Sequence, residues 1–317
     1  MLRYRVAVMI LLFALIGAAW HGGLAELGWP IISMALALAS SYVCATSVND
    51  IADKDIDRIN HPKDAGRPLV TGVAETRDLW LLFGVAGALA VGIPLTIGPL
   101  AVSIMALSVV IGVLYSLPPV ELSHRTFLAP LTLGVAYVGV PYWSGVVAVG
   151  ENLGASDLLP MSALYLLFTG RIILKDFRDR EGDAAYGKPT FLLRYGKRAT
   201  CLLSLVAVCA GDAMLVWALA DQAWLAALLQ LYVAGVAFML LRLYRADGRR
   251  EEQLSIGVGA RMGNGLLTTL LGALVLANSG ADTVVQATFA LALAAVYAIL
   301  FTGFLRNPDA AAIGYKG

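Results

Sequence analysis

The segment Asn49–Gly72, with the sequence NDIADKDIDRINHPKDAGRPLVTG, is a charged interruption in a strongly apolar chain. Of the 317 residues, 59% are hydrophobic and 14% are charged. Asn49, Asp53 and Asp57 lie four residues apart, so on a helix each step drifts by only about 40° and the three side chains share one face. Such a cluster at the end of an apolar helix is either a solvated loop or a site for a charged ligand.

Long apolar segments lie on both sides of this interruption. A helix needs about 20 predominantly apolar residues to cross a membrane, and the sequence predicts ten such spans. They cover residues 6–22, 27–48, 78–96, 99–117, 127–148, 157–174, 199–220, 223–242, 262–279 and 283–304. We therefore expect an all-α integral membrane protein in which residues 1–317 form one polytopic domain. The last pair is the weakest part of this prediction, because its short connection also fits a broken helix.

The basic residues predict the orientation of these spans, because cytoplasmic loops of membrane proteins are enriched in Lys and Arg. With ten spans and the amino terminus inside, all 23 Lys and Arg residues, from Arg3 to Lys316, fall at cytoplasmic ends or loops. The charged residues of the outside connections are all acidic. Both termini and the acidic segment are therefore expected on the cytoplasmic side, in the plasma membrane of a prokaryote.

Several other classes of site and partner are disfavoured. The three cysteines lie in apolar segments without CxxC or Cys/His spacing, which indicates neither a disulfide framework nor a zinc site. The first apolar run lacks a small-residue cleavage site, so no cleavable signal peptide is expected. No nucleic-acid-binding motif is present, and membrane lipid is the expected surrounding.

A second acidic cluster follows the sixth predicted span, in the segment Arg171–Asp183 with the sequence RIILKDFRDREGD. Asp176, Asp179 and Asp183 have i, i+3, i+7 spacing, which again places them on one helical face. The predicted topology brings both clusters to the same side of the membrane. Two halves of the chain are therefore expected to converge on one pocket.

Carboxylates gathered in one pocket repel one another unless a cation neutralises them. Oxygen ligands without His or Cys favour Mg²⁺, with Mn²⁺ as an alternative, over zinc. Because Mg²⁺ commonly bridges carboxylates to substrate phosphates, nearby basic residues indicate a phosphate or diphosphate ligand. Similar tripeptides, Gly66–Arg67–Pro68 and Gly187–Lys188–Pro189, follow the two clusters. The cations available to such a ligand are Arg67, Arg125, Lys175 and Lys188.

A tyrosine lies at the inner end of the fourth span, in the sequence YSLPP from Tyr115 to Pro119. The two prolines stop the helix. Tyr115 is then either an interfacial anchor or a catalytic group.

Some isolated polar residues are open to two interpretations. Asp50 and Asp55 fall off the face of the first cluster and are expected to be loop charges or supports of the site. His61 is placed near the pocket rim. Asp212 lies in the middle of a span, where a carboxylate is either functional or held neutral by a hydrogen bond.

Taken together, the motifs resemble those of the UbiA superfamily of intramembrane prenyltransferases. The NxxxDxxxD motif of that family is matched by Asn49, Asp53 and Asp57, its DxxxD motif by Asp179 and Asp183 with Asp176 just upstream, and its YSxPP turn by Tyr115 to Pro119. The resemblance covers about residues 5–280. It implies a bundle of nine helices around a central cavity with cytoplasmic cap loops, so the segment 283–304 is expected to be an extra tenth span.

The resemblance also implies the chemistry. Two Mg²⁺ ions would bind an isoprenyl diphosphate and stabilise its departing diphosphate, and an acceptor would capture the allylic cation. The implied metal ligands are Asn49, Asp53, Asp57, Asp176, Asp179 and Asp183. The implied catalytic residues are Asp53, Asp57, Asp179, Asp183 and Tyr115. The implied diphosphate-binding residues are Asn49, Arg67, Arg125, Lys175 and Lys188.

The acceptor and the outcome of the reaction stay open at this point. The sequences INHP, YSLPP and KDFRDREGD resemble the branch of archaeal geranylgeranylglyceryl phosphate prenyltransferases, chlorophyll synthases and homogentisate prenyltransferases more than the hydroxybenzoate enzymes. The acceptor is accordingly aromatic, quinone-like or a polar lipid. Alternatives are a membrane terpene cyclase or a phosphoribosyl-transferring relative with the same fold, and, in a different class, a transporter of an anionic solute.

Overall fold

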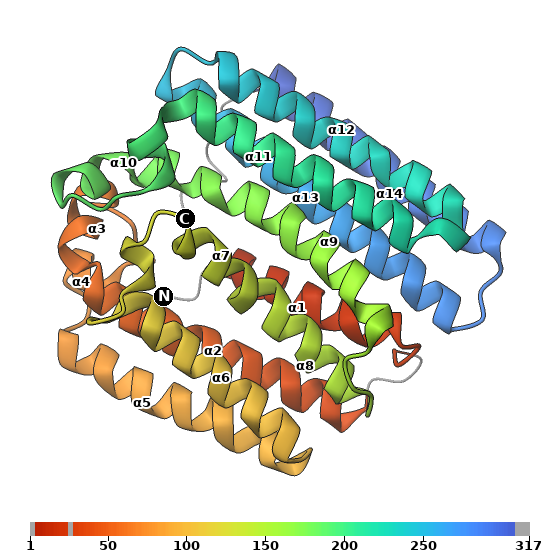
Figure 1. The fold of residues 1–317 in the computed structure, drawn as a ribbon, viewed down its shortest axis with the longest axis horizontal. Helices are drawn as coiled ribbons and strands as arrows, with labels where there is room; N and C mark the ends of the chain where they lie inside the picture. The colour runs from red at the N-terminus through yellow and green to blue at the C-terminus, as the bar shows by residue number, and fades with distance from the viewer. Residues whose placement is uncertain (1–3, 25–27, 308–317) are drawn as a thin grey trace.

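The chain forms a bundle of long helices with a small helical cap at one end (Figure 1). The computed structural model describes residues 4–24 and 28–307, and over those residues it contains no β-strand. The all-α prediction is therefore confirmed. Arg3 and Lys316, which enter the argument on orientation, lie outside the described residues.

The ten predicted spans all fall largely within helices. The helices of the bundle are α1 (Tyr4–Trp20), α2 (Trp29–Ala52), α5 (Thr76–Gly92), α6 (Pro99–Ser116), α7 (Leu128–Gly134), α8 (Val140–Ala148), α9 (Ala155–Ile172), α11 (Phe191–Ala218), α12 (Ala223–Arg245), α13 (Arg249–Asn278) and α14 (Thr283–Arg306). A π-helical turn, Val135–Gly139, joins α7 to α8. Within the described residues, nine helices or runs of successive helices are long and apolar enough to cross a membrane.

The last and the first helices account for the difference between nine and ten spans. The segment predicted as an extra span is α14, which is one of the nine and is separate from α13. The apolar part of α1, Val6–Trp20, is shorter than the other spans. The protein is accordingly a multi-pass integral membrane protein, in which α1 is the short tenth apolar helix.

The short helix α1 is packed deep inside the bundle against α8. An added Cβ at Gly145 would lie 1.8 Å from the Ala14 carbonyl oxygen, and one at Gly17 would lie 2.3 Å from the Tyr142 carbonyl oxygen. Only glycine permits this approach, which is the small-residue packing that membrane helices use. Gly17 and Gly145 therefore let the backbones of α1 and α8 lie in direct contact.

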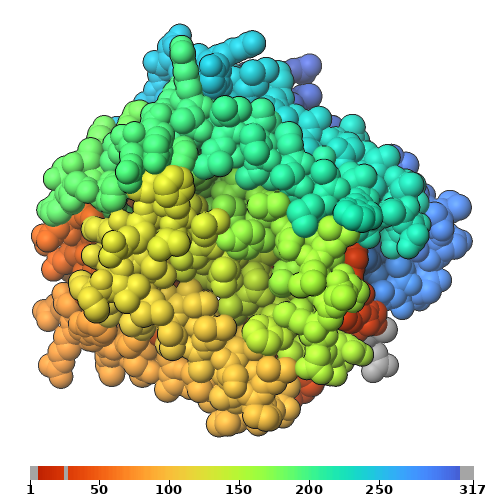
Figure 2. Space-filling model, viewed as in Figure 1, coloured from red at the N-terminus to blue at the C-terminus, as the bar shows by residue number. Residues whose placement is uncertain are grey.

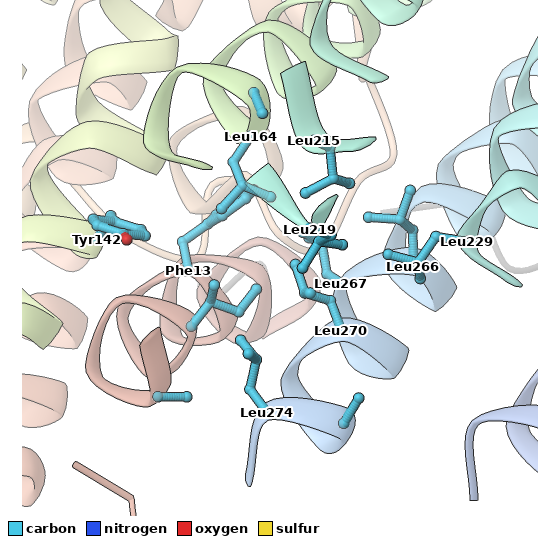
Figure 3. Packing of buried hydrophobic residues seen from close by; sticks show 14 of the residues in the cluster. Phe13, Tyr142, Leu164, Leu215, Leu219, Leu229, Leu266, Leu267, Leu270 and Leu274 are labelled. Atoms are coloured by element: carbon cyan, nitrogen blue, oxygen red, sulfur yellow. The ribbon is translucent and has the colours of Figure 1, made fainter. Parts of the chain in front are cut away.

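The core joins helices from both halves of the chain. Phe13, Tyr142, Leu164, Leu215 and Leu267 are all less than 5% exposed and belong to one cluster. In Figure 3 their side chains, together with neighbouring leucines, converge from α1, α8, α9, α11 and α13. At the edge of the bundle, α14 instead leaves large apolar side chains exposed, as expected of a surface that faces lipid.

The cap grows out of two nearly continuous helices. The helix α2 ends at Ala52 and α3 (Lys54–Asn60) begins immediately, with the backbone bonds Asp53 N to Asn49 O and Asp57 N to Asp53 O, both 2.8 Å, carrying the helical pattern across the junction. In the same way a 3₁₀ turn leads from α9 into α10 (Asp176–Ala185). The small helix α4 (Pro68–Thr71) completes the cap.

Candidate functional site

The two acidic clusters lie together at the capped end of the bundle. The first cluster spans the end of α2 and α3, and the second lies on α10, which packs against α3 (Figure 1). Two contacts join these helices directly. The Gly182 backbone N–H donates to Asn60 Oδ1 at 2.7 Å, and His61 Nε2 lies 3.0 Å from Asp179 Oδ1.

Asp53 is surrounded by donors from both halves of the chain. Asn49 Nδ2 donates to Asp53 Oδ2 at 2.9 Å. Lys188 Nζ reaches both oxygens of the same carboxylate, at 3.3 and 3.4 Å, although the two residues are 135 positions apart. Gly187 has a φ of +64°, a left-handed conformation that suits glycine. This turn lets the chain beyond α10 fold back towards the first cluster.

Arg67 holds two carboxylates of the first cluster below the surface. Its Nη1 donates to Asp57 Oδ2 and, at 3.1 Å, to Asp50 Oδ1. All three residues are 6% exposed or less. Burial therefore excludes the loop-charge interpretation of Asp50 and leaves its role as a support of the site. Asp55, in contrast, is exposed and pairs with Arg58 at 2.7 Å, as expected of a loop charge.

The second cluster is more buried than a solvated loop would be. Asp176 and Asp183 are 8% and 4% exposed. Asp179 accepts a hydrogen bond from Arg178 Nε at 3.0 Å besides its contact with His61. Since Lys188, which follows the second cluster, pairs with Asp53 of the first at 3.3 Å, the charges of the two clusters are connected.

Tyr115 joins the site through a lysine of the second cluster. Lys175 Nζ lies 3.4 Å from Tyr115 Oη, which is a long hydrogen bond. The helix α6 ends at Ser116, as the two following prolines predict. The tyrosine that sequence alone left open between anchor and catalytic group is therefore located beside the acidic clusters.

Arg125 is a predicted site residue whose side chain is exposed. Within residues 4–24 and 28–307, it makes no hydrogen bond or ion pair with either cluster. The next residue, Thr126, donates to the Pro189 carbonyl oxygen at 2.6 Å, and the Phe127 and Phe191 rings pack edge to face. In Figure 2 this yellow loop lies against the green segment that begins α11. Arg125 thus lies in a loop that packs against the segment directly after Lys188.

The second cluster is also anchored from the side opposite α3. Glu252 near the start of α13 is 6% exposed and accepts from Lys197 Nζ at 3.0 Å. Arg180 lies 3.7 Å from the other oxygen of Glu252, and Arg249 pairs with Glu181 at 2.5 Å. These contacts hold α10 against α11 and α13, so the cap is braced by the second half of the bundle.

The donor set fits a hard divalent cation. Asp53, Asp57, Asp179 and Asp183 supply the carboxylate oxygens that Mg²⁺ prefers. Within the part of the chain that the structure describes, no three His, Cys, Asp or Glu side chains are gathered closely enough to hold one ion as they stand. Basic side chains lie on three of these carboxylates, with Lys188 on Asp53, Arg67 on Asp57 and Arg178 on Asp179.

Sequence reasoning gave no clear role to His61 or Asn60. A signal was present, because His61 continues the four-residue spacing of Asn49, Asp53 and Asp57 by one more step. Asn60 gives no such signal, since its partner is a backbone N–H on α10. Asp212, at a distance from the cap, accepts from Gln230 Nε2 at 2.9 Å, which supports the hydrogen-bonded interpretation of that residue.

Comparisons with known proteins agree with this geometry. A family model described as the UbiA prenyltransferase family matches residues 8–265. A 2-acylphloroglucinol 4-prenyltransferase of Humulus lupulus is 29% identical over 206 residues, covering 60% of this chain and 49% of that protein. A chloroplastic chlorophyll synthase of Avena sativa is 28% identical over 160 residues, covering 47% of this chain and 40% of that protein. The chain thus spans about half the length, or less, of these curated relatives.

A solved structure shares the fold. A UbiA homolog from Archaeoglobus fulgidus, bound to GPP and Mg²⁺, superposes with a TM-score of 0.65 at 17% identity and covers 87% of this chain and 98% of that chain. At this identity the likeness establishes the fold. The helical bundle is therefore a known architecture.

Proposed function

The chain belongs to the UbiA prenyltransferase family, and from this premise we propose that it transfers a prenyl group from an isoprenyl diphosphate to an acceptor and releases diphosphate. One observation carries the proposal. Two acidic clusters from separate halves of the chain meet at one end of an apolar bundle, with Lys188 of one half on Asp53 of the other at 3.3 Å. A solvated loop would not bury and cross-pair these charges.

In this proposal the carboxylates hold Mg²⁺. Asp53, Asp57, Asp179 and Asp183 are the principal ligands, with Asn49 and Asp176 beside them. Bound Mg²⁺ neutralises these carboxylates and stabilises the negative charge that develops on the departing diphosphate. The A. fulgidus homolog, which was solved with GPP and Mg²⁺, supports the choice of ion and of substrate class.

The basic side chains bind and orient the diphosphate. Lys188 pairs with Asp53 of the first cluster, and Lys175 directly precedes Asp176 of the second. Their ammonium groups would donate to phosphate oxygens when a cation neutralises the carboxylates. Tyr115, 3.4 Å from Lys175 Nζ, is placed to face the allylic end of the substrate. Arg67 was expected to bind the diphosphate, and its guanidinium binds Asp50 and Asp57. In this proposal it holds these carboxylates in place, whereas Arg125, in the loop that packs against the segment after Lys188, meets the substrate as it enters.

The apolar interior shields the reacting carbon from water and receives the prenyl tail. A pocket between α1, α9, α11, α12 and α13 is lined by Phe13, Leu164, Phe168, Val236 and Leu267. Its one charged lining residue is Arg171, which lies one helical turn before Lys175. The pocket is small, about 20 Å³, so a prenyl tail that enters it would have to displace its lining side chains. Exclusion of water protects an allylic cation until the acceptor captures it.

The acidic end faces the cytoplasm in this proposal. The helix α12 ends with Arg242 and Arg245, and α13 begins with Arg249 and Arg250, at the end of the bundle that also carries α10. This accumulation of positive charge is typical of cytoplasmic ends. Both substrates would then arrive from the cytoplasm or laterally from the inner leaflet.

The test is diphosphate release by the purified protein with Mg²⁺, geranylgeranyl diphosphate and a mixture of aromatic, quinone-like and polar lipid acceptors. Asp53→Asn and Asp179→Asn should each abolish Mg²⁺-dependent release. Asp55→Asn, at an exposed position two residues after Asp53, should leave it unchanged. Unchanged release by Asp53→Asn and Asp179→Asn would refute the assignment of the site. Mass spectrometry of the products, with aromatic, quinone-like and polar lipid acceptors, identifies the acceptor. A cyclised hydrocarbon formed without acceptor would make the protein a terpene cyclase of the same fold.

A further inference from the structure

The contact between Asn60 and Gly182 is unusual for two helices of a cap. Gly182 lies inside α10, where a helical N–H normally has its partner within the helix, yet its N–H donates to Asn60 Oδ1 of α3 at 2.7 Å. The two residues are 122 positions apart in the sequence. A side chain of one helix therefore hydrogen-bonds to the backbone of the other.

Glycine is required at this contact for a steric reason. A Cβ added at Gly182 would lie 2.6 Å from Asn60 Nδ2 and 2.6 Å from the Ile56 carbonyl oxygen. The amide of Asn60 can rotate away. The carbonyl oxygen of Ile56, however, belongs to the backbone of α3, and the Ile56 side chain is buried, 7% exposed. To restore an ordinary contact of 3.4 Å, α3 and α10 would have to separate by about 0.8 Å.

The contacting atoms adjoin the proposed metal ligands on both sides. Ile56 precedes Asp57, and Gly182 precedes Asp183. The distance between these two backbones therefore sets the distance between the carboxylates that they carry. Because Mg²⁺ requires its ligand oxygens at 2.0–2.1 Å in near-octahedral geometry, a separation of about 0.8 Å between the backbones is expected to weaken cation binding.

We propose that Asn60 and Gly182 are positioning residues, whose docking contact fixes the separation of the two acidic clusters for cation binding. The inference rests on the proposed function of the site. It assigns to Gly182 a role that is independent of helix propensity, because Gly→Ala inside a helix normally stabilises that helix by roughly 0.5–1 kcal/mol. If Gly182→Ala weakens the site, the cause is therefore the contact with α3 and not a less stable α10 helix.

The first measurement is a distance that does not depend on activity. In the full chain with Cys209, the exposed native cysteine, changed to Ala, spin labels at Arg58→Cys on α3 and Ala184→Cys on α10 report the separation of the two helices. We expect a narrow distance distribution in this background and a longer or broader one with Gly182→Ala. The matched control is Gly84→Ala in α5, where an added Cβ meets nothing within 4 Å, and it should leave the distribution unchanged.

The second measurement is the Mg²⁺ concentration that gives half-maximal diphosphate release in the unlabelled protein. Gly182→Ala should raise it by about tenfold, the lower end of what residues that orient metal ligands contribute, whereas Gly84→Ala should not change it. A loss of folded protein alone would lower the amplitude without moving this concentration.

The asparagine gives a second pair of variants should Gly182→Ala fail to fold. Asn60→Asp keeps an oxygen acceptor for the Gly182 N–H and should preserve the narrow distance distribution, whereas Asn60→Ala should broaden it. An unchanged distribution in both Gly182→Ala and Asn60→Ala would overturn the proposal. If the parent protein released no diphosphate with any prenyl diphosphate, the proposed function would fail, and the label distances would still decide whether this contact sets the separation.

Discussion

Replacing Lys188 by Met is expected to destabilise the protein without Mg²⁺. Its Nζ lies 3.3 Å from Asp53 Oδ1, and the two side chains are 8% and 14% exposed. At an effective dielectric constant of about 20, the attraction of two unit charges at this distance is about 5 kcal/mol. Removing one partner of a buried pair typically costs about 3–5 kcal/mol, because the other charge stays buried. Since Asn49 still donates to Asp53, we expect a loss of about 3 kcal/mol.

Mg²⁺ should reverse this loss. The ammonium group of Lys188 and a divalent cation compete for the same carboxylate, so its removal should favour the cation by up to about 3 kcal/mol, or roughly 100-fold in affinity. The assay is the thermal unfolding midpoint in detergent over a Mg²⁺ titration. Lys188→Met should unfold at a lower temperature without Mg²⁺, gain more from Mg²⁺ than the parent does, and reach half of that gain at a lower concentration.

The rate of diphosphate release should fall in Lys188→Met, although its affinity for Mg²⁺ rises. Without the ammonium group, the diphosphate loses a donor, and the rate of diphosphate release should fall by about 10²-fold. Lys63→Met, at an exposed position of the same cap, is the matched control and should change neither quantity. If Lys188→Met were as stable as the parent without Mg²⁺ and gained no more stability from the ion, the ion pair between Lys188 and Asp53 would not have the predicted effect on stability.

Three further substitutions test separate parts of the structure. Arg67→Met removes the guanidinium that Asp50 and Asp57 share, so the free energy of unfolding should fall by about 3–5 kcal/mol. Denaturation in detergent measures this fall, and an unaltered free energy would contradict the buried network. Gly145→Ala places a Cβ 1.8 Å from the Ala14 carbonyl oxygen and should cost about 3 kcal/mol or more, while Gly92→Ala, which meets nothing, serves as its control in thermal unfolding. Asp212→Asn retains an acceptor for Gln230 and should keep the parent rate of diphosphate release, whereas a rate reduced tenfold would give that carboxylate a functional role.

The sequence predicts the helices well because their signals are local. Apolar length identified all ten segments as helical, and the four-residue spacing placed Asn49, Asp53 and Asp57 on a continuous stretch at the end of α2 and in α3. The distribution of polar segments also predicted that both acidic clusters lie at one end of the bundle. Each of these inferences needs only the period of a helix and the thickness of a membrane.

The pairing within the site was beyond such reasoning. Topology places Arg125 and Lys188 at the same end of the bundle, but only the packing of the chain beyond α10 determines that Lys188 reaches Asp53 while Arg125 remains exposed. Asp50 points off the face of the first cluster, and nothing in the local pattern shows that Arg67 returns to bind it. These contacts join residues 17 to 135 positions apart, where helical periodicity carries no information.

The cross-pairing has a consequence for how the two clusters respond to change. Lys188, which follows the second cluster, binds Asp53 of the first, and His61, which follows the first, contacts Asp179 of the second. Neutralising Asp53 would therefore remove the partner of Lys188 and change the charge next to the second cluster, although no residue of that cluster is altered. Groups that share partners in this way are not additive. The two motifs that lie far apart in the sequence thus behave as one site.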